Sequence, residues 1–507
     1  MFAHLLSVMI FLPIVAGLIL LFAPLSRTTA RIVGFGVSLA VLVLSIDVYA
    51  GFSATGKLEF VEYIPWIPSL GIAYHLGIDG ISLFILMASA VLLPMVYVLF
   101  GTREKGYYAN LLLVEGAMIG AVCAADLVLF YVFWEVILLP VFFMLGLYGG
   151  PRKIHATLKI TLYTIAGSLL MLAALAYLAV QYHALTGEWS FSIEKMGLLD
   201  LSGHAAALAL FGFMIAFAIK IPLFPFHTWL PDAYTEAPTA TTFVLSAIMA
   251  KIGVYGVIRV VMPAFEMEFA RYALFFAYAG VIGMMYCGLT AIAQKDYKRL
   301  LAFSSASHMG IIAVGVFSMN VQALTGTIYQ IVAHATSTGV LFLFAGILEE
   351  RTRTRTINDL GGIASQAPIF ALFFAIAMLA SVGLPGTSGF IGEFLIILGA
   401  LKFNVAVGVL TGLSLIIGVC YMLWLFQRVF FEKTKTASER FKDLSPVESL
   451  AFVPVILLIL VMGIYPHPFL RKIEPSTAQY FAAATPIVAQ ATTATPALAA
   501  DLTTEKN

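Results

Sequence analysis

The chain has 507 residues, of which 61% are hydrophobic and only 11% are charged, and its mean hydropathy is +0.99. A soluble domain typically carries about 25% charged residues, so this composition excludes a soluble globular protein. The net charge of +1 indicates no particular partner, and we expect no nucleic-acid binding. Apolar runs fill almost the whole chain, and they are long enough to cross a hydrocarbon core of about 30 Å. The sequence therefore predicts an all-α polytopic membrane protein.

Fourteen apolar stretches are predicted to span the membrane. They are 3–23, 31–51, 80–100, 108–125, 127–147, 157–181, 206–230, 237–262, 271–293, 299–318, 322–348, 368–402, 405–430 and 447–465. A hairpin-like segment, 52–78, joins the second and third spans, and its aromatic residues Tyr63, Trp66 and Tyr74 suit a membrane interface.

The loops after odd-numbered spans hold most of the Lys and Arg residues. Such loops face the cytoplasm, so both termini are expected on the outer side of the membrane. We expect that membrane to be a bacterial inner membrane. The chain ends in an Ala- and Thr-rich segment, 476–507, which we predict to be disordered.

Two of the spans are interrupted in their middle. Pro222 and Pro225 follow Lys220 within 206–230, and SVGLPGTSGF brings three glycines and one proline into 368–402. Proline breaks a helix, and irregular backbone at membrane depth is tolerated where it lines a cavity or is buried in protein. A pair of interrupted spans is typical of inverted repeats in transporters, although two packing kinks are the alternative.

The pattern predicts two inverted five-helix repeats, each with one broken helix. The predicted units are 1–106 (helices 1–3 with the external hairpin), 107–262 (first repeat, helices 4–8), 270–431 (second repeat, helices 9–13), 446–475 (helix 14) and 476–507 (the tail).

Seven ionisable residues lie within or beside these apolar spans. They are Glu135, Lys220, His227, Lys251, His308, His334 and Glu393. Charged groups inside a membrane are expensive and mark ion or proton pathways. Burial favours the neutral form of an amine and a nearby carboxylate favours the charged form, so Glu135 and Lys220 can act as a switch. The histidines can bridge because imidazole titrates near physiological pH.

Each of these residues also has a purely structural interpretation. Glu135 and Lys220 can form a structural ion pair, and His308 and His334 can be hydrogen-bonded core histidines. Glu115, in the fourth span, is left without an assigned role. Asp79 stands at the start of the third span and is expected to cap that helix.

The three cysteines, Cys123, Cys287 and Cys420, lie far apart within apolar runs. That spacing supports neither a metal site nor a disulfide framework, and no glycine-rich nucleotide loop is present. We therefore expect no cofactor or metal on this chain.

Five segments carry a family resemblance between about residues 75 and 430. They are HTWLPDAYTEAPT, AKIGVYGVIR, FWEVILLPVFFMLGLYGG, LLAFSSASHMG and IVAHATSTGVLFLFAGIL. Together they resemble the signature of the proton-translocating, antiporter-like membrane subunits of respiratory complex I (NADH–quinone oxidoreductase) and of Mrp-type sodium/proton antiporters. Tyr234 departs from the family pattern, which has histidine there.

The resemblance implies a role for each of the seven residues. Glu135 and Lys220 match the family's coupling pair, Lys251 its central lysine and Glu393 its exit carboxylate, while His227, His308 and His334 match its internal histidines. Glu393 stands where two of the three large complex I subunits carry lysine, so the chain is most similar to the M branch, or subunit 4 type.

The resemblance also implies partners. NAD, FMN, iron–sulfur clusters and quinone would be bound by partner subunits that oxidise NADH, and sibling antiporter-like subunits and lipid would surround this chain. Two alternatives remain at this point: a subunit of an Mrp-type sodium/proton antiporter, and a structural spacer without its own proton path. Isosteric neutralisation of Glu135 or Lys220 would leave the activity of a spacer intact.

Overall fold

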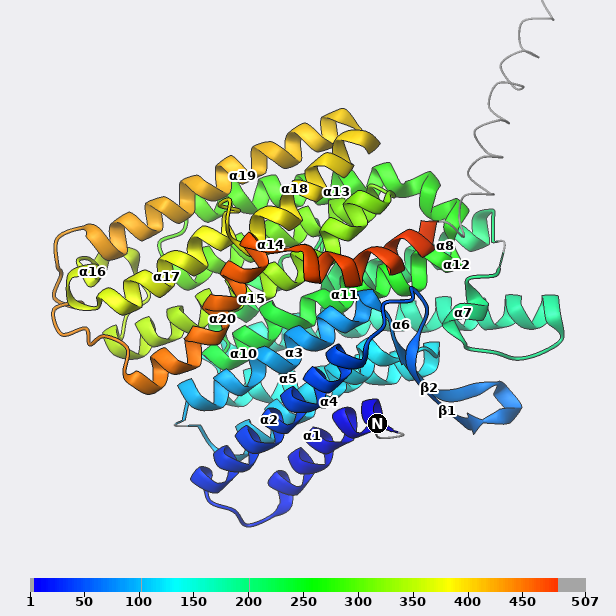
Figure 1. The fold of residues 1–507 in the computed structure, drawn as a ribbon, viewed down its shortest axis with the longest axis horizontal. Helices are drawn as coiled ribbons and strands as arrows, with labels where there is room; N and C mark the ends of the chain where they lie inside the picture. The colour runs from blue at the N-terminus through cyan, green and yellow to red at the C-terminus, as the bar shows by residue number, and fades with distance from the viewer. Residues whose placement is uncertain (1–3, 102, 200, 482–507) are drawn as a thin grey trace, which may run out of the picture.

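The computed structural model describes residues 4–101, 103–199 and 201–481, and these form a thick bundle of long helices (Figure 1). Twelve helices in the described residues are long and apolar enough to cross a membrane, and two shorter apolar helices accompany them. The chain is therefore a multi-pass membrane protein. The predicted count of fourteen spans and the predicted repeats stay predictions.

The first half of the bundle contains the helices from α1 to α12. Their bounds are α1 (Leu5–Phe22), α2 (Arg27–Gly51), α3 (Gly80–Leu99), α4 (Lys105–Cys123), α5 (Leu127–Tyr148), α6 (Lys153–Thr186), α7 (Ile193–Met196), α8 (His204–Lys220), α9 (Trp229–Glu236), α10 (Thr239–Val244), α11 (Ala250–Gly256) and α12 (Met262–Ala264). Helices α10, α11 and α12 belong to one continuous span, Thr239–Ala264, in which the π-helical segments Leu245–Met249 and Val257–Val261 stand on either side of α11.

The second half runs from α13 to α20. Its bounds are α13 (Glu266–Ile292), α14 (Tyr297–Phe317), α15 (Val321–Thr352), α16 (Ile363–Gln366), α17 (Pro368–Ser381), α18 (Ser388–Phe403), α19 (Val405–Phe426) and α20 (Pro446–Ile464). Polar side chains cap several of the long helices by accepting backbone N–H groups that have no partner inside the helix. These N-cap residues are Ser26, Asp79, Asp126, Asp296, Asn320, Asn404 and Ser445.

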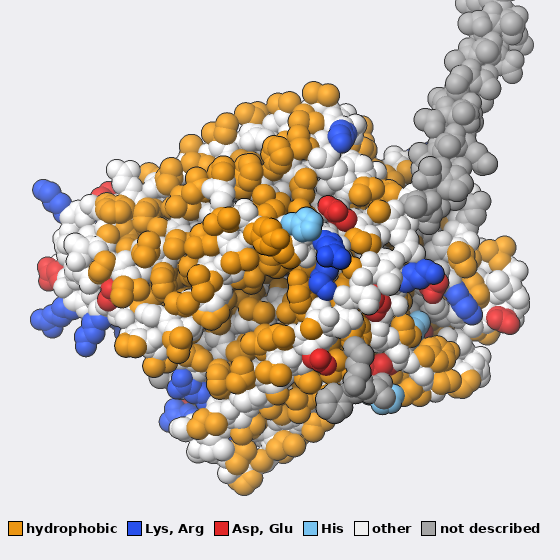
Figure 2. Space-filling view, in the orientation of Figure 1, with side chains coloured by type: hydrophobic (Ala, Val, Ile, Leu, Met, Phe, Trp, Pro, Cys, Tyr) orange, Lys and Arg blue, Asp and Glu red, His pale blue; other side chains and the backbone are white. Residues whose placement is uncertain are grey.

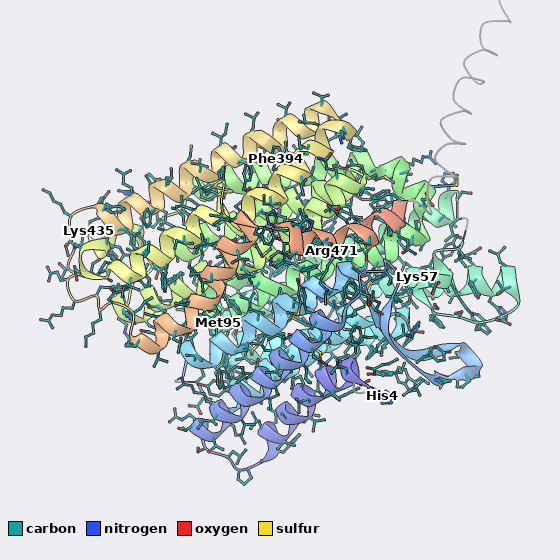
Figure 3. The ribbon with its side chains drawn as sticks, viewed as in Figure 1. His4, Lys57, Met95, Phe394, Lys435 and Arg471 are labelled. Atoms are coloured by element: carbon teal, nitrogen blue, oxygen red, sulfur yellow. The ribbon has the colours of Figure 1, made fainter. Side chains whose placement is uncertain are left out.

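The predicted hairpin is confirmed. Strands β1 (Glu59–Ile67) and β2 (Ile72–Ile78) pair antiparallel, with Tyr63 opposite His75. The hairpin projects from one end of the bundle, which we call the hairpin end (Figure 1). Figure 3 shows Lys57 and His4 toward this end and Lys435 at the opposite end, which we call the basic end.

The helices that carry Lys251, His308 and His334 lie at the centre of the bundle. Helices α14 and α15 are buried along their whole apolar length and Thr239–Ala264 is nearly so, whereas only a minority of the residues of α2 and α20 are buried. Hydrophobic side chains cover most of the visible surface between the two ends, and the Lys and Arg side chains stand toward the two ends (Figure 2). The outer helices therefore suit contact with lipid, while the central helices contact only protein.

Both helix interruptions lie where the prolines and glycines predicted them. Helix α8 ends at Lys220 and α9 begins at Trp229; α17 ends at Ser381 and α18 begins at Ser388. The π-helical segments around Lys251 have no counterpart in the prediction, because a π turn inside an apolar helix leaves no distinct hydrophobic period.

The predicted boundary between helix 14 and a disordered tail at residue 476 is wrong. Helix α20 ends at Ile464, and a further helix continues over residues 467–481. Lys472 Nζ donates to the carbonyls of Tyr49 and Phe52 at 3.0 and 2.8 Å, and Gly80 N–H donates to Ser476 Oγ at 2.9 Å. These contacts hold the segment against the ends of α2 and α3. The rest of the predicted tail, 482–507, lies outside the described residues.

Asp126 joins the hairpin to the start of α5. Its Oδ1 accepts the N–H groups of Val128 and Leu129 at 2.9 and 3.1 Å, and its Oδ2 accepts that of Ala73 at 3.2 Å. We predict that Asp126→Ala destabilises this end of the protein by about 1 kcal/mol or more, because an N-cap is lost. The variant's hairpin is cleaved faster in limited proteolysis of the purified complex. Asp126→Asn, which keeps the cap, stays close to wild type; equal cleavage of the two variants would contradict this role.

Candidate functional site

Lys251 lies at the centre of the bundle on α11, and it is 1% exposed. Its Nζ donates to the carbonyl of Ser246 and lies 2.7 Å from His334 Nδ1. Ser246 belongs to the π-helical segment Leu245–Met249. A π turn shifts the backbone hydrogen bonds by one residue and is frequent at functional sites. The amine is therefore bound by a backbone carbonyl and an imidazole, and within the described residues it forms no ion pair.

His334 and His308 extend the contact from Lys251 to a carboxylate. The two imidazole rings, on α15 and α14, have their centroids 5.7 Å apart. His308 Nδ1 lies 3.0 Å from Glu393 Oε1. Among the described residues, Nε2 of each histidine is buried without a hydrogen-bond partner. An imidazole can accept a proton on one nitrogen and release one from the other, so the arrangement is chemically able to pass protons.

Glu393 occupies space that the interruption between α17 and α18 provides. It is 1% exposed, and Gln330 Nε2 donates to its Oε1 at 3.0 Å. Gly383, in the interruption, has a φ of +69°, and a Cβ there would come within 2.4 Å of Glu393 Oε2. Glycine therefore fits this position for two reasons: it allows the positive φ of the turn, and it leaves space for the Glu393 carboxyl group.

Lys220 is the last residue of α8, and its Nζ lies 3.6 Å from the centre of the Trp134 ring. Such a cation–π contact stabilises a desolvated ammonium group by about 2 kcal/mol. Trp229 Nε1 donates to the Ile219 carbonyl at 2.8 Å, which gives a hydrogen-bond partner to one carbonyl at the end of the interrupted helix. The interruption thus leaves a lysine at a helix end inside the bundle.

The direct Glu135–Lys220 ion pair suggested by the sequence is not formed. Among the described residues Glu135 forms no ion pair, and its Oε1 is buried without a hydrogen-bond partner. Trp134 and Glu135 are consecutive on α5, so their side chains point about 100° apart. The Trp134 ring takes the position beside the amine, and Glu135 lies on a half-buried flank of α5.

His227 is not brought into contact with the other six residues. The helix resumes only at Trp229, and His227 lies in the irregular segment before it. Its ring stacks on Phe224 at 5.5 Å and meets the edge of Tyr286 at 5.2 Å between centroids. Within the described residues, the hydrogen bonds and ion pairs contain no link from His227 to Lys220.

The two lysines lie on neighbouring backbones. A Cβ at Gly253, two residues after Lys251, would come within 3.2 Å of Lys220 Cβ and 3.1 Å of the Ile221 nitrogen. The end of α8 therefore packs directly on α11. The seven predicted residues form a connected group of four (Lys251, His334, His308 and Glu393), a nearby pair without direct contact (Lys220 and Glu135), and His227 apart from both.

Several contributors were missed by the sequence analysis. Gln330 and the Ser246 carbonyl contact the connected group, and neither residue type stands out in an apolar helix. Glu115, which was left without a role, is fully buried and accepts a hydrogen bond from Ser38 Oγ at 2.9 Å. Asp79 caps α3 as predicted, in a capping box with Ser82. Within the described residues no cluster of three His, Cys, Asp or Glu side chains could hold a metal ion.

Comparison with known proteins decides the family. Residues 124–418 match the family described as NADH:quinone oxidoreductase/Mrp antiporter, transmembrane. The chain is also 38% identical to NADH-quinone oxidoreductase subunit M of Rickettsia typhi over 478 residues, covering 92% of this chain and 96% of the relative. The chain belongs to the NADH:quinone oxidoreductase/Mrp antiporter family.

Solved structures of the family share the fold. A chain of respiratory complex I from Thermus thermophilus with bound NADH matches with a TM-score of 0.87 and 34% identity, covering 94% of this chain and 98% of that one. A chain of the Mrp complex from Dietzia sp. matches with a TM-score of 0.84 at 21% identity, covering 94% and 97%. The second likeness concerns the fold alone.

Gly383 and Gly386 offer a matched pair of substitutions. Both have positive φ values, +69° and +92°, but a Cβ at Gly386 meets nothing within 4 Å. Alanine at either position strains the turn by about 1 to 2 kcal/mol. We predict that only Gly383→Ala also displaces Glu393, which infrared difference spectra detect as a shifted carboxyl band. Identical band shifts in the two variants would contradict the contact.

Proposed function

We propose that this chain is the M-type (subunit 4 type) membrane subunit of NADH:quinone oxidoreductase, and that it translocates protons through its buried ionisable residues. The observation that carries the proposal is the contact sequence Lys251–His334–His308–Glu393. It joins four helices, α11, α15, α14 and α18, and the last of these begins directly after the second helix interruption. NADH oxidation and quinone reduction belong to partner subunits, which would hold NAD, FMN, iron–sulfur clusters and quinone.

The chemistry of the group supports a directed transfer. Charged Lys251 can donate its proton to His334 Nδ1, at 2.7 Å. The proton then passes to the neighbouring imidazole of His308, whose ring centroid lies 5.7 Å from that of His334, and on to Glu393, at 3.0 Å from His308 Nδ1. An ionised group inside the bundle is costly. Transfer along the whole group ends on Glu393, so it leaves fewer charged groups than a single transfer from Lys251 to His334 would. The Ser246 carbonyl keeps Lys251 aimed at His334.

Lys220 and Glu135 are the switch in this proposal. A charge on Lys220 next to α11 raises the free energy of a second charge on Lys251, because like charges repel in a medium of low dielectric constant. When Glu135 moves away or is neutralised, Lys220 can release its proton and lose its positive charge. The repulsion then falls, and Lys251 is charged more readily. The Trp134 ring, which lies against the Lys220 amine, holds that amine in place without an ion pair to Glu135.

The topology in the proposal follows the basic loops. The basic end faces the cytoplasm of a bacterial cell, and both termini and the hairpin end face outward. Segments α8–α9 and α17–α18 each count as one interrupted span, which gives the predicted fourteen. The units 107–262 and 270–431 are the two inverted repeats. Sibling antiporter-like subunits would cover the two flanks, and lipid the rest.

The relatives favour this function over a sodium/proton antiporter. The likeness to the subunit M relative spans 92% of the chain at 38% identity, whereas the Mrp chain shares the fold at 21% identity. A spacer subunit would need no contact sequence of lysine, histidines and carboxylate at its centre.

Neutralising Lys220 tests the pump. In inverted membrane vesicles, we predict that the Lys220→Ala complex assembles but loses most NADH-driven, inhibitor-sensitive proton uptake. The reason is that a charge on residue 220 no longer controls the protonation of Lys251. NADH oxidation coupled to uptake falls with it. Lys57 is exposed and lies just before β1, toward the hairpin end. The Lys57→Ala variant serves as the control and keeps wild-type uptake.

Two results would contradict the proposal. Wild-type uptake by the Lys220→Ala complex would make Lys220 a structural brace. NADH oxidation that never depends on this chain, together with sodium tolerance that does, would identify an antiporter subunit.

A further inference from the structure

Three polar side chains follow one another along the helix of Lys251 toward the hairpin end. Lys251, Tyr255 and Arg259 are four residues apart, so they share one face of the helix. Arg259 lies within the π-helical segment Val257–Val261. The proton-transfer group uses only the first of the three, which leaves the other two without a function.

Arg259 is bound to a second helix by its charge. Its Nη2 lies 2.8 Å from Asp79 Oδ1, and its Nε donates to the Tyr255 hydroxyl at 3.1 Å. The same Asp79 oxygen accepts the N–H groups of Ile81 and Ser82 at 3.0 Å each. The side chains of Arg259 and Asp79 are only 19% and 6% exposed. This ion pair therefore joins the start of α3 to the helix of Lys251 near the hairpin end.

An aromatic layer lies beside Tyr255, on the same stretch of the helix. We define it as Phe130, Trp134, Phe217 and Tyr255. Neighbouring rings have centroids 5.3 to 6.5 Å apart. A Cβ at Gly256 would come within 2.3 Å of the Phe217 ring, so the layer is packed against the backbone of α11. Such packing leaves little room for a file of water along this face.

We propose that the Arg259–Asp79 ion pair and the aromatic layer form a proton seal between Lys251 and the hairpin end. The inference rests on the proposed proton-pumping function. A fixed guanidinium repels protons, and an apolar constriction excludes water; transmembrane pores use both devices against proton leakage. The seal forces a proton on Lys251 to leave through His334 and prevents its return from the hairpin side.

The two members of the ion pair have different roles. Arg259 supplies the positive barrier, whereas Asp79 positions it and caps α3. Arg259→Gln removes the barrier and leaves a buried carboxylate that attracts protons. Asp79→Asn keeps the barrier and the N-cap, because asparagine is a good capping residue. A structural brace would instead respond equally to the loss of either partner, since each loss leaves one unpaired buried charge.

The test measures passive proton flow through the whole complex in proteoliposomes, without NADH. We expect a pH gradient imposed across Arg259→Gln vesicles to decay several-fold faster than across wild-type vesicles. Arg259→Lys, which keeps the charge, and Asp79→Asn stay tight. The leak disappears when Lys251→Ala is added to Arg259→Gln, because the leaking protons pass over Lys251. Arg271→Gln, which removes the exposed partner of the buried Glu268 at the same end, leaves the vesicles tight.

Three outcomes would overturn the seal. They are tight Arg259→Gln vesicles, equal leaks in Arg259→Gln and Asp79→Asn, and a leak that survives Lys251→Ala. If Arg259→Gln does not assemble, the double variant Arg259→Gln/Asp79→Asn carries no unpaired charge and is expected to leak; tight vesicles there also overturn the seal. NADH-driven uptake by Lys251→Ala alone is measured in parallel: wild-type uptake contradicts the proposed function itself, whatever the leak.

Discussion

The structure depends on how a buried amine is stabilised without a neighbouring carboxylate. An unpaired charge or unsatisfied polar group in an apolar interior is destabilising by several kcal/mol. Lys251 meets this constraint with the Ser246 carbonyl and His334 Nδ1. Both partners can hold the amine without fixing its proton permanently. A tight ion pair at the same place would stabilise the charged lysine and oppose proton release.

Local departures from regular helix supply these partners. The π-helical segment before α11 brings the Ser246 carbonyl to the amine, and the interruption after α17 makes room for Glu393. The interruption after α8 places Lys220 at a helix end over the Trp134 ring. Each departure lies beside an ionisable group, and irregular backbone inside a membrane protein is tolerated where protein surrounds it. The long regular helices around them provide the apolar shell.

Much of this arrangement could be predicted from the sequence. Lysines, histidines and a carboxylate stand out in apolar spans because they are costly there, and prolines and glycines marked both interruptions. The contacts themselves could not be predicted: Lys251 and His334 are 83 residues apart, and His308 and Glu393 are 85 apart. Their meeting depends on how α11, α14, α15 and α18 pack, which periodicity does not specify.

The structure departs from two sequence-based interpretations for physical reasons: the alternative of a Glu135–Lys220 ion pair, and the predicted disorder from residue 476. Glu135 and Lys220 have opposite charges, but the turn of α5 presents Trp134 to the amine instead. Residues 476–481 directly precede the Ala-rich stretch and were predicted to be disordered with it, yet contacts such as the one from Gly80 N–H to Ser476 Oγ keep them helical and packed. In both cases a tertiary contact outweighed the local pattern.

In the proposed mechanism, protons pass through the His334 imidazole, which lies between Lys251 and His308. The most direct measurement is the number of protons taken up per NADH oxidised by inverted vesicles carrying His334→Gln, with assembly verified in the same preparation. Glutamine can still hydrogen-bond to Lys251 but cannot carry a proton at neutral pH. We expect a ratio clearly below that of wild type in an assembled complex. An unchanged ratio would contradict a proton path through His334.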